Sequence, residues 1–226
     1  MKPSHRISRL LQSIVELCGL TPWLIGAVIV LFWFAAVAKA QEVPIELFQV
    51  TASVGGCAGT VVEPFQNAKG EWKWVVITAA HCVGEGETRN VKLLYPPSQK
   101  KEFSSKCIYR DRANDVAVLS FNPIAPVPFA KIGEPPPEGA EVFTVGYPSG
   151  ELKGKPSTVT GNNLTGKHLT IRDDIWYGNS GGGLLHNGNL VGVASSRTGS
   201  SGPSIFARTE SVKLAYHVAS VQLGFQ

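Results

Sequence analysis

The stretch from Asp173 to Gly183 constrains this chain most, because it places Ser180 among four glycines, Gly178, Gly181, Gly182 and Gly183. Glycine loses more backbone entropy on folding than any other residue, so such a cluster indicates backbone conformations or close approaches that a Cβ would forbid. An acyl-transfer site has that requirement, since its serine Oγ stands exposed at a turn near backbone N–H groups that face the developing oxyanion. Gly178 and Ser180 would supply two such donors. A glycine-rich hairpin without a chemical role is the alternative that this stretch alone leaves open.

Two further motifs supply partners for such a serine. His81 ends the apolar run Val75-Val76-Ile77-Thr78-Ala79-Ala80 and is followed directly by a cysteine, and Asp115 opens the apolar run Val116-Ala117-Val118-Leu119. A histidine at the end of a strand, or Asn-Asp before one, is ordinary by itself. The three residues together stand in the order His, Asp, Ser.

These motifs resemble the hallmarks of the chymotrypsin-like (trypsin-like) serine proteases, which read Thr-Ala-Ala-His-Cys, Asp-(Ile/Val)-Ala-(Leu/Val)-Leu and Gly-Asp/Asn-Ser-Gly-Gly. The order of the three residues distinguishes that family from subtilisins and α/β-hydrolases. The resemblance runs from about Gly55 to Arg208. It implies that Ser180 is a nucleophile, His81 its general base, Asp115 the group that orients His81, and the amides of Gly178 and Ser180 the oxyanion hole. The implied reaction is hydrolysis of peptide bonds through an acyl-enzyme, without a cofactor or metal.

The composition agrees with the fold that this resemblance implies. With 24 glycines and 15 prolines between short apolar runs, the chain is expected to be all-β. The family has two six-stranded antiparallel β-barrels, often with a C-terminal helix. We therefore expect a first barrel over 41–125, a proline-rich linker over 126–139, a second barrel over 140–208 and a helix over 209–226. The strands expected in the first barrel are 57–62, 72–78, 91–95, 103–109 and 116–121, and Asn187-Gly188 predicts a hairpin turn in the second.

Three cysteines lie in the body of the chain. By resemblance to the family, Cys57 and Cys82 are expected to form a disulfide. A metal site would require more Cys or His at ligand spacing than the sequence offers. Cys107 is interpreted as a small buried hydrophobic residue.

Residues 1–40 read as a secretory signal, with a basic start, an apolar stretch from Trp23 to Ala38, and Ala38-Lys39-Ala40 before Gln41. The uncharged run over 17–38 is also long enough to span a bilayer, so a retained signal-anchor is the alternative. Either way the body is exported: it is secreted or periplasmic, or else anchored with the protease domain outside the cytoplasm. Most of the formal charge of +4 belongs to this leader, so the body has no basic cluster suited to nucleic acid.

One carboxylate before Ser180 indicates a specificity pocket. Asp174 stands six residues before Ser180, where trypsins keep the carboxylate of their primary pocket, and this favours Arg or Lys before the scissile bond. Ser195 and Arg197 would line the mouth of the pocket, and Arg197 would neutralise Asp174 if the two paired. A preference for small or apolar residues, or a solvated Asp174 outside the pocket, are the alternatives.

The expected partner is a protein or peptide substrate. The chain is expected to be a monomer, and to contact a membrane only through an uncleaved leader. Two other classes of function stay open: a catalytically weak or inactive protease-like binding module, and a membrane-tethered interaction protein. Asn179 stands where trypsins have the aspartate that binds their freshly cut N-terminus, so activation by that ion pair is not expected.

Overall fold

The computed structural model describes residues 42–66, 69–84, 87–94, 100–162, 168–173, 175, 177–197 and 204–225. The leader over 1–40, Asp174 and the side chain of Arg197 lie outside the described residues. None of the helices in the described part is long and apolar enough to cross a membrane.

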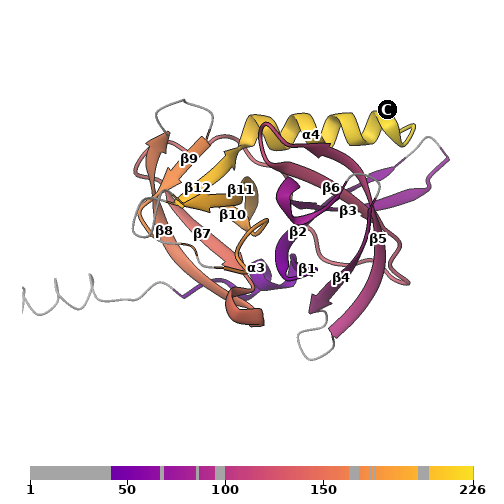
Figure 1. Cartoon of the computed structure of the whole chain (residues 1–226), viewed down its shortest axis with the longest axis horizontal. Coiled ribbons are helices and arrows are strands. Elements are labelled where there is room, and N and C mark those ends of the chain that lie inside the picture. Colours follow the sequence, from indigo (N-terminus) through magenta and orange to yellow (C-terminus); the bar gives the residue numbers. More distant parts are fainter. Residues whose placement is uncertain are drawn as a thin grey trace, which may run out of the picture. The chain divides into compact units, whose positions relative to one another are not determined.

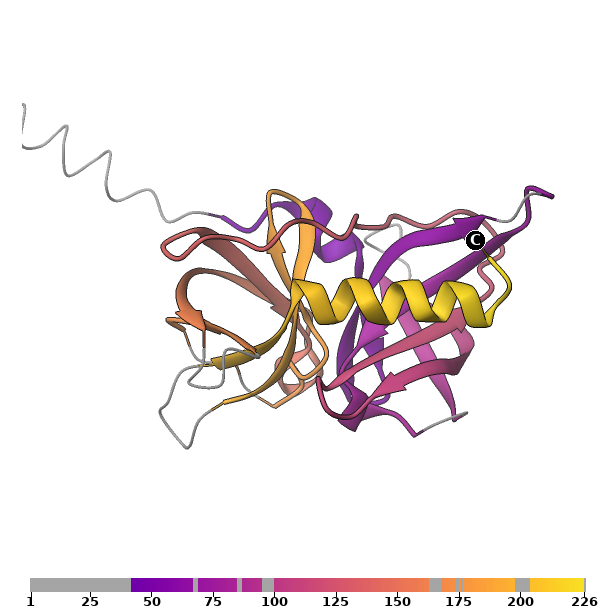
Figure 2. The ribbon, with the colours of Figure 1, turned by 90° about the horizontal axis from the view of Figure 1, so that it is seen from above.

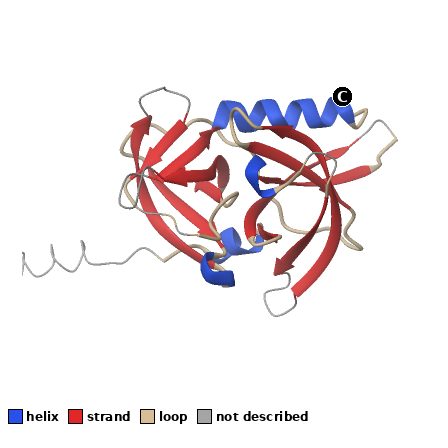
Figure 3. Cartoon of the chain, viewed as in Figure 1, coloured by secondary structure: helices blue, strands red, loops and turns tan. Residues whose placement is uncertain are grey.

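Twelve strands in the described residues form two closed antiparallel barrels of six strands each (Figures 1 and 3), which confirms the expected fold class. The first barrel closes in the order β1-β2-β3-β6-β5-β4. The second closes in the order β10-β11-β12-β9-β8-β7. The strands of the first are β1 (Thr51–Val54), β2 (Cys57–Gln66), β3 (Trp72–Thr78), β4 (Thr88–Leu94), β5 (Lys100–Asp111) and β6 (Val116–Phe121). Those of the second are β7 (Glu141–Gly146), β8 (Lys153–Asn162), β9 (His168–Ile171), β10 (Gly183–His186), β11 (Asn189–Arg197) and β12 (Ser204–Arg208).

Strand β1 was not among the strands expected from the sequence. It is a hairpin partner of β2, with Val54 opposite Cys57, and it also pairs with β4 to close the barrel. The hairpin turns at Gly55 and Gly56, whose φ angles of 54° and 90° suit glycine. A short helix, α3 (Ile45–Gln49), precedes it. Asn187 and Gly188 form the expected turn between β10 and β11, with φ angles of 50° and 78°.

The C-terminal helix α4 (Thr209–Gln222) runs along both barrels (Figures 1 and 2) and contacts β5, β6, β11 and β12. Its face of Val212, Ala215 and Ala219 is buried. Tyr216 packs its ring 4.5 Å from that of Phe65 and donates a hydrogen bond to the carbonyl of Glu63 at 2.9 Å. The helix therefore clamps the two barrels together by apolar contact.

A disulfide joins Cys57, the first residue of β2, to Cys82 in the short 3-10 turn η1 (Ala80–Cys82). The two cysteines are 25 residues apart in the chain. Cys107 lies outside this bond and is buried, with its Sγ 3.4 Å from the carbonyl of Tyr109. The sequence-based pairing is the one in the structure.

We expect loss of this disulfide in Cys57→Ala/Cys82→Ala to lower the free energy of unfolding by roughly 2 to 4 kcal/mol, because it closes a 25-residue loop in the unfolded chain. Guanidinium unfolding of a protein that comprises residues 41–226 measures the loss. A reductant should reproduce it in the parent and change nothing further in the double variant. The prediction would be contradicted if the reductant left the unfolding midpoint of the parent protein unchanged.

Candidate active site

His81 is held in a turn that is fixed on several sides. Strand β3 ends at Thr78, and the chain passes through two buried alanines into η1. The disulfide ties Cys82 to β2, and Arg110 Nε, from β5, donates a hydrogen bond to the carbonyl of Ala80 at 2.8 Å. The His81 side chain itself is 47% exposed. A rigid turn thus presents a solvent-accessible imidazole.

Asp115 stands just before β6 with a φ of +54°, in the left-handed region that few residues other than glycine adopt. Its carboxylate is 19% exposed and accepts three hydrogen bonds. The His81 amide donates to Oδ1 at 2.9 Å, the His81 ring nitrogen Nδ1 lies 2.8 Å from Oδ2, and Ser195 Oγ donates to Oδ2 at 2.6 Å. One carboxylate therefore connects η1 of the first barrel with β11 of the second.

These contacts move the pKa of both partners. Burial by itself would raise the pKa of Asp115, but the hydrogen bonds from His81 and Ser195 outweigh it and lower that pKa. The hydrogen bond to Asp115 raises the pKa of His81, against the opposing effect of burial. Because an ionised carboxylate only accepts, Nδ1 carries the proton, so in the neutral imidazole Nε2 is left as an acceptor.

Neighbouring atoms leave no room for a side chain at the glycines on either side of Ser180. A Cβ on Gly178 would lie 2.1 Å from the carbonyl oxygen of Tyr147, and its φ is +93°. A Cβ on Gly181 would lie 2.1 Å from Thr78 Oγ1, and its φ is +78°. Backbone and side-chain oxygens of other segments thus approach this loop too closely for any residue with a Cβ.

The same close approach places Ser180 beside the segments that carry His81. The Ser180 carbonyl accepts a hydrogen bond from the Ala58 amide at 2.7 Å, and Ala58 follows the disulfide residue Cys57. Gly181 packs against Thr78, the last residue of β3. Ser180 of the second barrel thereby meets the His81 turn of the first.

Two backbone donors at this loop are unoccupied. Within the described part of the chain, neither the Gly178 amide nor the Ser180 amide donates a hydrogen bond. Nor does a hydrogen bond join the Ser180 hydroxyl to the His81 ring among these residues. Tyr177, which precedes the loop, is 93% exposed, so solvent reaches this region. The two amides are available to an acceptor that enters from outside.

Of the three residues predicted to bind substrate, the structure describes the side chain of Ser195 but not those of Asp174 and Arg197. Ser195, expected at the pocket mouth, directs its hydroxyl to Asp115. Asp173 lies 3.8 Å from Lys155 Nζ, and Ser204 Oγ holds the backbone of Asp173 and Ile175, the sequence neighbours of Asp174. The contact of Ser195 with Asp115 and that of Arg110 with Ala80 were not predicted, because no sequence motif links partners 80 and 30 residues apart.

One cluster of metal-ligating residue types occurs in the described part of the chain. The ligand atoms of Cys57, His81 and Cys82 all lie within 4.8 Å of one another. Both sulfurs belong to the disulfide, so they offer no thiolate to a metal. Only one ligand remains, and the residues present do not fit a zinc site.

The first of the two closed β-barrels carries the hydrogen-bonded pair of His81 and Asp115, and the second carries Ser180 between glycines. This combination defines the class of trypsin-like peptidases. A family model described as "Trypsin-like peptidase domain" matches residues 57–193, and the chain belongs to this family. A serine protease of Mycobacterium tuberculosis is 30% identical over 138 residues, which are 52% of this chain and 32% of that protein. A probable periplasmic serine endoprotease, DegP-like, of Rickettsia conorii is 25% identical over 66% of this chain and 30% of its own. The chain spans about a third of the length of these relatives.

Solved structures agree with the fold. The serine endoprotease of Yersinia pestis superposes with a TM-score of 0.63 at 17% identity, over 79% of this chain and 68% of the other. The inactive form of the mycobacterial protease gives 0.60 at 23% identity, over 77% and 91%. At these identities the likeness concerns the fold alone.

We expect His81 to keep its proton to a pH above the ordinary histidine value of about 6.5, because Asp115 stabilises the imidazolium. In Asp115→Asn the negative charge is gone and burial remains, so the midpoint should move to lower pH. NMR titration of the His81 ring protons measures the midpoint in both proteins. An unchanged His81 midpoint in the variant would show that Asp115 does not set this pKa.

Proposed function

We propose that the chain is an exported serine endopeptidase that hydrolyses peptide bonds through an acyl-enzyme formed on Ser180. The observation that carries this proposal is the Nδ1–Oδ2 contact of 2.8 Å between His81 and Asp115, on the barrel that faces the Ser180 loop. This contact prepares the opposite ring nitrogen to accept a proton. The family of the chain supports the reaction class.

The proposed reaction begins when the substrate carbonyl settles at the loop. Nε2 of His81 takes the proton from Ser180 Oγ as Oγ attacks the carbonyl carbon. The oxyanion that forms is stabilised by the amides of Gly178 and Ser180, which have no other acceptor among the described residues. The imidazolium then protonates the leaving amine, the C–N bond breaks, and the acyl group stays on Oγ.

Water completes the cycle by the same route in reverse. His81 accepts a proton from the water as it attacks the acyl ester, and returns that proton to Ser180 Oγ as the acid product leaves. Asp115 keeps its negative charge throughout and stabilises the imidazolium in both halves. The hydroxyl of Ser195 stabilises the ionised form of Asp115. All the groups required are side chains and amides of this chain.

Export is proposed on three grounds. The apolar leader over 1–40 reads as a secretory signal, the Cys57–Cys82 disulfide suits an oxidising compartment, and some relatives are named as periplasmic. We propose that the leader is removed after Ala40 and that the remaining chain acts as a monomer on protein or peptide substrates. N-terminal sequencing of the exported protein tests the cleavage.

An inactive binding module is the second candidate function. The observation that favours it is that the Ser180 hydroxyl and the His81 ring share no hydrogen bond among the described residues. Hydrogen bonds of this kind often tighten only when substrate binds, and an enzyme therefore agrees with the same observation.

Ser180→Ala should abolish labelling by a fluorophosphonate and lower peptide turnover by about 10⁴-fold or more, because the nucleophile is lost while the fold stays. Labelling of the parent, detected by mass spectrometry at Ser180, separates the enzyme from the binding module. Ser104→Ala, which removes an exposed hydroxyl from β5 of the first barrel, serves as the matched control and should label fully. Peptidase activity that survives in Ser180→Ala would refute the assignment.

Asp174 remains the proposed determinant of specificity, and its neighbour Asp173 provides the control. Asp174→Ala should reduce kcat/KM for a peptide that ends in Arg more than for matched peptides that end in Ala or Leu, since a carboxylate in the pocket selects a cation. Asp173→Ala should leave that ratio unchanged, because its carboxylate pairs with Lys155. A parent without preference for Arg, or an equal effect of both variants, would exclude Asp174 from this role.

A further inference from the structure

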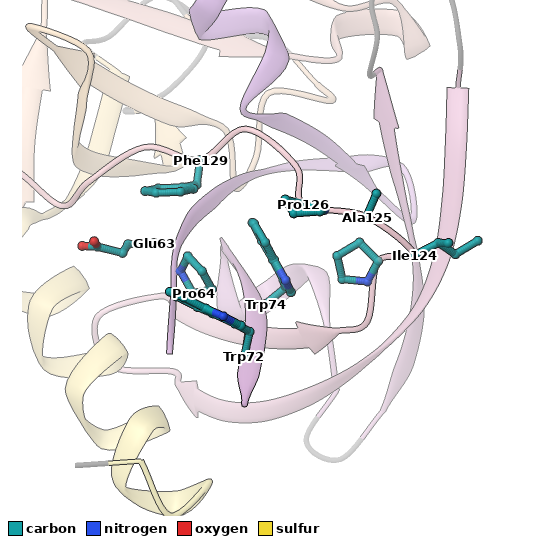
Figure 4. A pocket seen from close by; sticks show the side chains of 9 residues that line it. Glu63, Pro64, Trp72, Trp74, Ile124, Ala125, Pro126 and Phe129 are labelled. Atoms are coloured by element: carbon teal, nitrogen blue, oxygen red, sulfur yellow. The ribbon is translucent and has the colours of Figure 1, made fainter. Parts of the chain in front are cut away.

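A hollow lined by apolar side chains opens on the first barrel at the end of β3 opposite to His81. Its volume is about 480 Å³, within the range of ligand sites in proteins. Trp72 and Trp74 lie on one side, and the segment from Ile124 to Phe129, which leads into the linker, lies on the other (Figure 4). We call it the tryptophan groove.

The groove is remote from the proposed active site. Strand β3 spans seven residues from Trp72 to Thr78, and His81 follows three residues later. At a rise of about 3.3 Å per residue the strand separates the two ends by about 20 Å. The groove therefore lies outside the region that the catalytic reaction uses.

The aromatic rings of the groove are exposed. Trp72 is 53% exposed and Phe129 40%, and Ile124 at the rim is 99% exposed. Positions 72 and 74 point to the same side of a strand, so both indoles face the groove. The ring of Phe129 meets that of Trp74 edge-on, with 6.2 Å between centroids and an angle of 64°. Exposed apolar side chains that gather around one hollow, rather than lie scattered singly, are typical of a binding surface.

The groove is also rigid. Three prolines line it, Pro64, Pro123 and Pro126, and each fixes its own φ. The linker is tied to β2 by the amide of Glu63, which donates to the carbonyl of Ala130 at 3.1 Å, and by the amide of Ala130, which donates to the carbonyl of Val61 at 2.9 Å. A preformed site loses little entropy when it binds a ligand.

Among the described residues that line this apolar space, one side chain is charged. Glu63 is exposed at its edge (Figure 4), and its carboxylate takes part in no ion pair among the described residues. Its backbone is held by Ala130 on one side and by the Tyr216 hydroxyl on the other. In Figure 4 the carboxylate lies on the Phe129 side of the groove and points away from the two indoles, so a cation bound there gains a charge partner beside the Phe129 ring.

We propose that the tryptophan groove binds an extended, proline-containing peptide segment that carries an arginine or lysine. Aromatic grooves bind extended prolines because the peptide is already ordered and its rings stack flat on the indoles. The basic side chain lies over the rings and pairs with Glu63. The groove would hold a segment of a partner or substrate protein away from the bond that is cut.

The charge of the groove disfavours a membrane surface and an acidic or wholly apolar peptide as its ligand. An anionic membrane surface attracts basic residues, whereas this lining contains an acid and neither lysine nor arginine. An acidic peptide would be repelled by the Glu63 carboxylate, and a wholly apolar peptide would gain nothing from it. A cationic ligand is the one whose binding satisfies every group that lines the space.

The test uses the exported protein as Ser180→Ala, so that probes are not cut. A fluorescein-labelled peptide of sequence PPRPLPPRP is titrated by fluorescence anisotropy, beside one with glutamates in place of the arginines and one with glycines in place of the prolines. The first should bind, and each of the others should bind about tenfold or more weakly. Equal affinity for all three, or no binding at millimolar protein, would overturn the proposal.

Variants locate the binding on the groove. Trp72→Ser should weaken the arginine peptide about tenfold, and Glu63→Gln should weaken it severalfold while leaving a norleucine version of the peptide unchanged. Leu214→Ser removes an apolar side chain of similar exposure, 52%, from α4 and should have no effect. With Ser180 restored, Trp72→Ser should take up fluorophosphonate at the parent rate, which shows an intact fold separately from peptide binding.

Two outcomes would assign the groove to something else. Binding to vesicles of phosphatidylglycerol and phosphatidylethanolamine that Trp72→Ser abolishes, without peptide binding, would make it a membrane contact. Self-association that Trp72→Ser abolishes, seen by sedimentation, would make it an interface between copies. Either result would overturn the peptide proposal and would leave the proposed reaction at Ser180 untouched.

Discussion

The carboxylate of Asp115 is the contact on which the site depends. It is mostly buried, and burial alone would favour its neutral form. Three donors reverse that preference: the His81 amide, the His81 ring and the Ser195 hydroxyl. Because these donors come from the first and the second barrel, the contact that orients the imidazole also joins the barrels. The uncommon backbone conformation of Asp115, with φ at +54°, is compensated by these bonds.

The second constraint is the lack of space at the Ser180 loop. Gly178 and Gly181 each face a neighbouring oxygen at 2.1 Å from the point where a Cβ would stand. These close approaches by neighbouring segments fix the loop. The Ser180 carbonyl also accepts a hydrogen bond from the Ala58 amide. A loop fixed in this way points the amides of Gly178 and Ser180, which have no acceptor among the described residues, in a constant direction, and electrostatic stabilisation of an oxyanion requires such a fixed arrangement. The entropy lost by the glycines is the cost of that geometry.

Local motifs predicted the fold and supplied the candidate site residues, but they did not predict the contacts between those residues. The runs around His81, Asp115 and Ser180 carry the family order, and the Asn187-Gly188 turn follows from its own two residues. Strand β1 was missed because four residues, Thr51 to Val54, carry too little periodicity, and only pairing with β2 and β4 makes them a strand. Ser195 reaches Asp115 across 80 residues, so its role depends on how the barrels meet. The tryptophan groove was missed for the same reason, since Phe129 meets Trp74 only after the linker has folded back.

Strand β3 connects the groove with the His81 turn, and its construction limits how the two communicate. From Val75 to Thr78 every residue is buried, and the strand pairs with β2 on one side and β6 on the other. A strand fixed on both sides has no second arrangement that a ligand at one end would select, and coupling between sites requires such a two-state element. A polypeptide that occupies both sites therefore gains by effective concentration rather than by a change at His81. Crossing about 20 Å takes about six extended residues or more, so short peptides would react without any contribution from the groove.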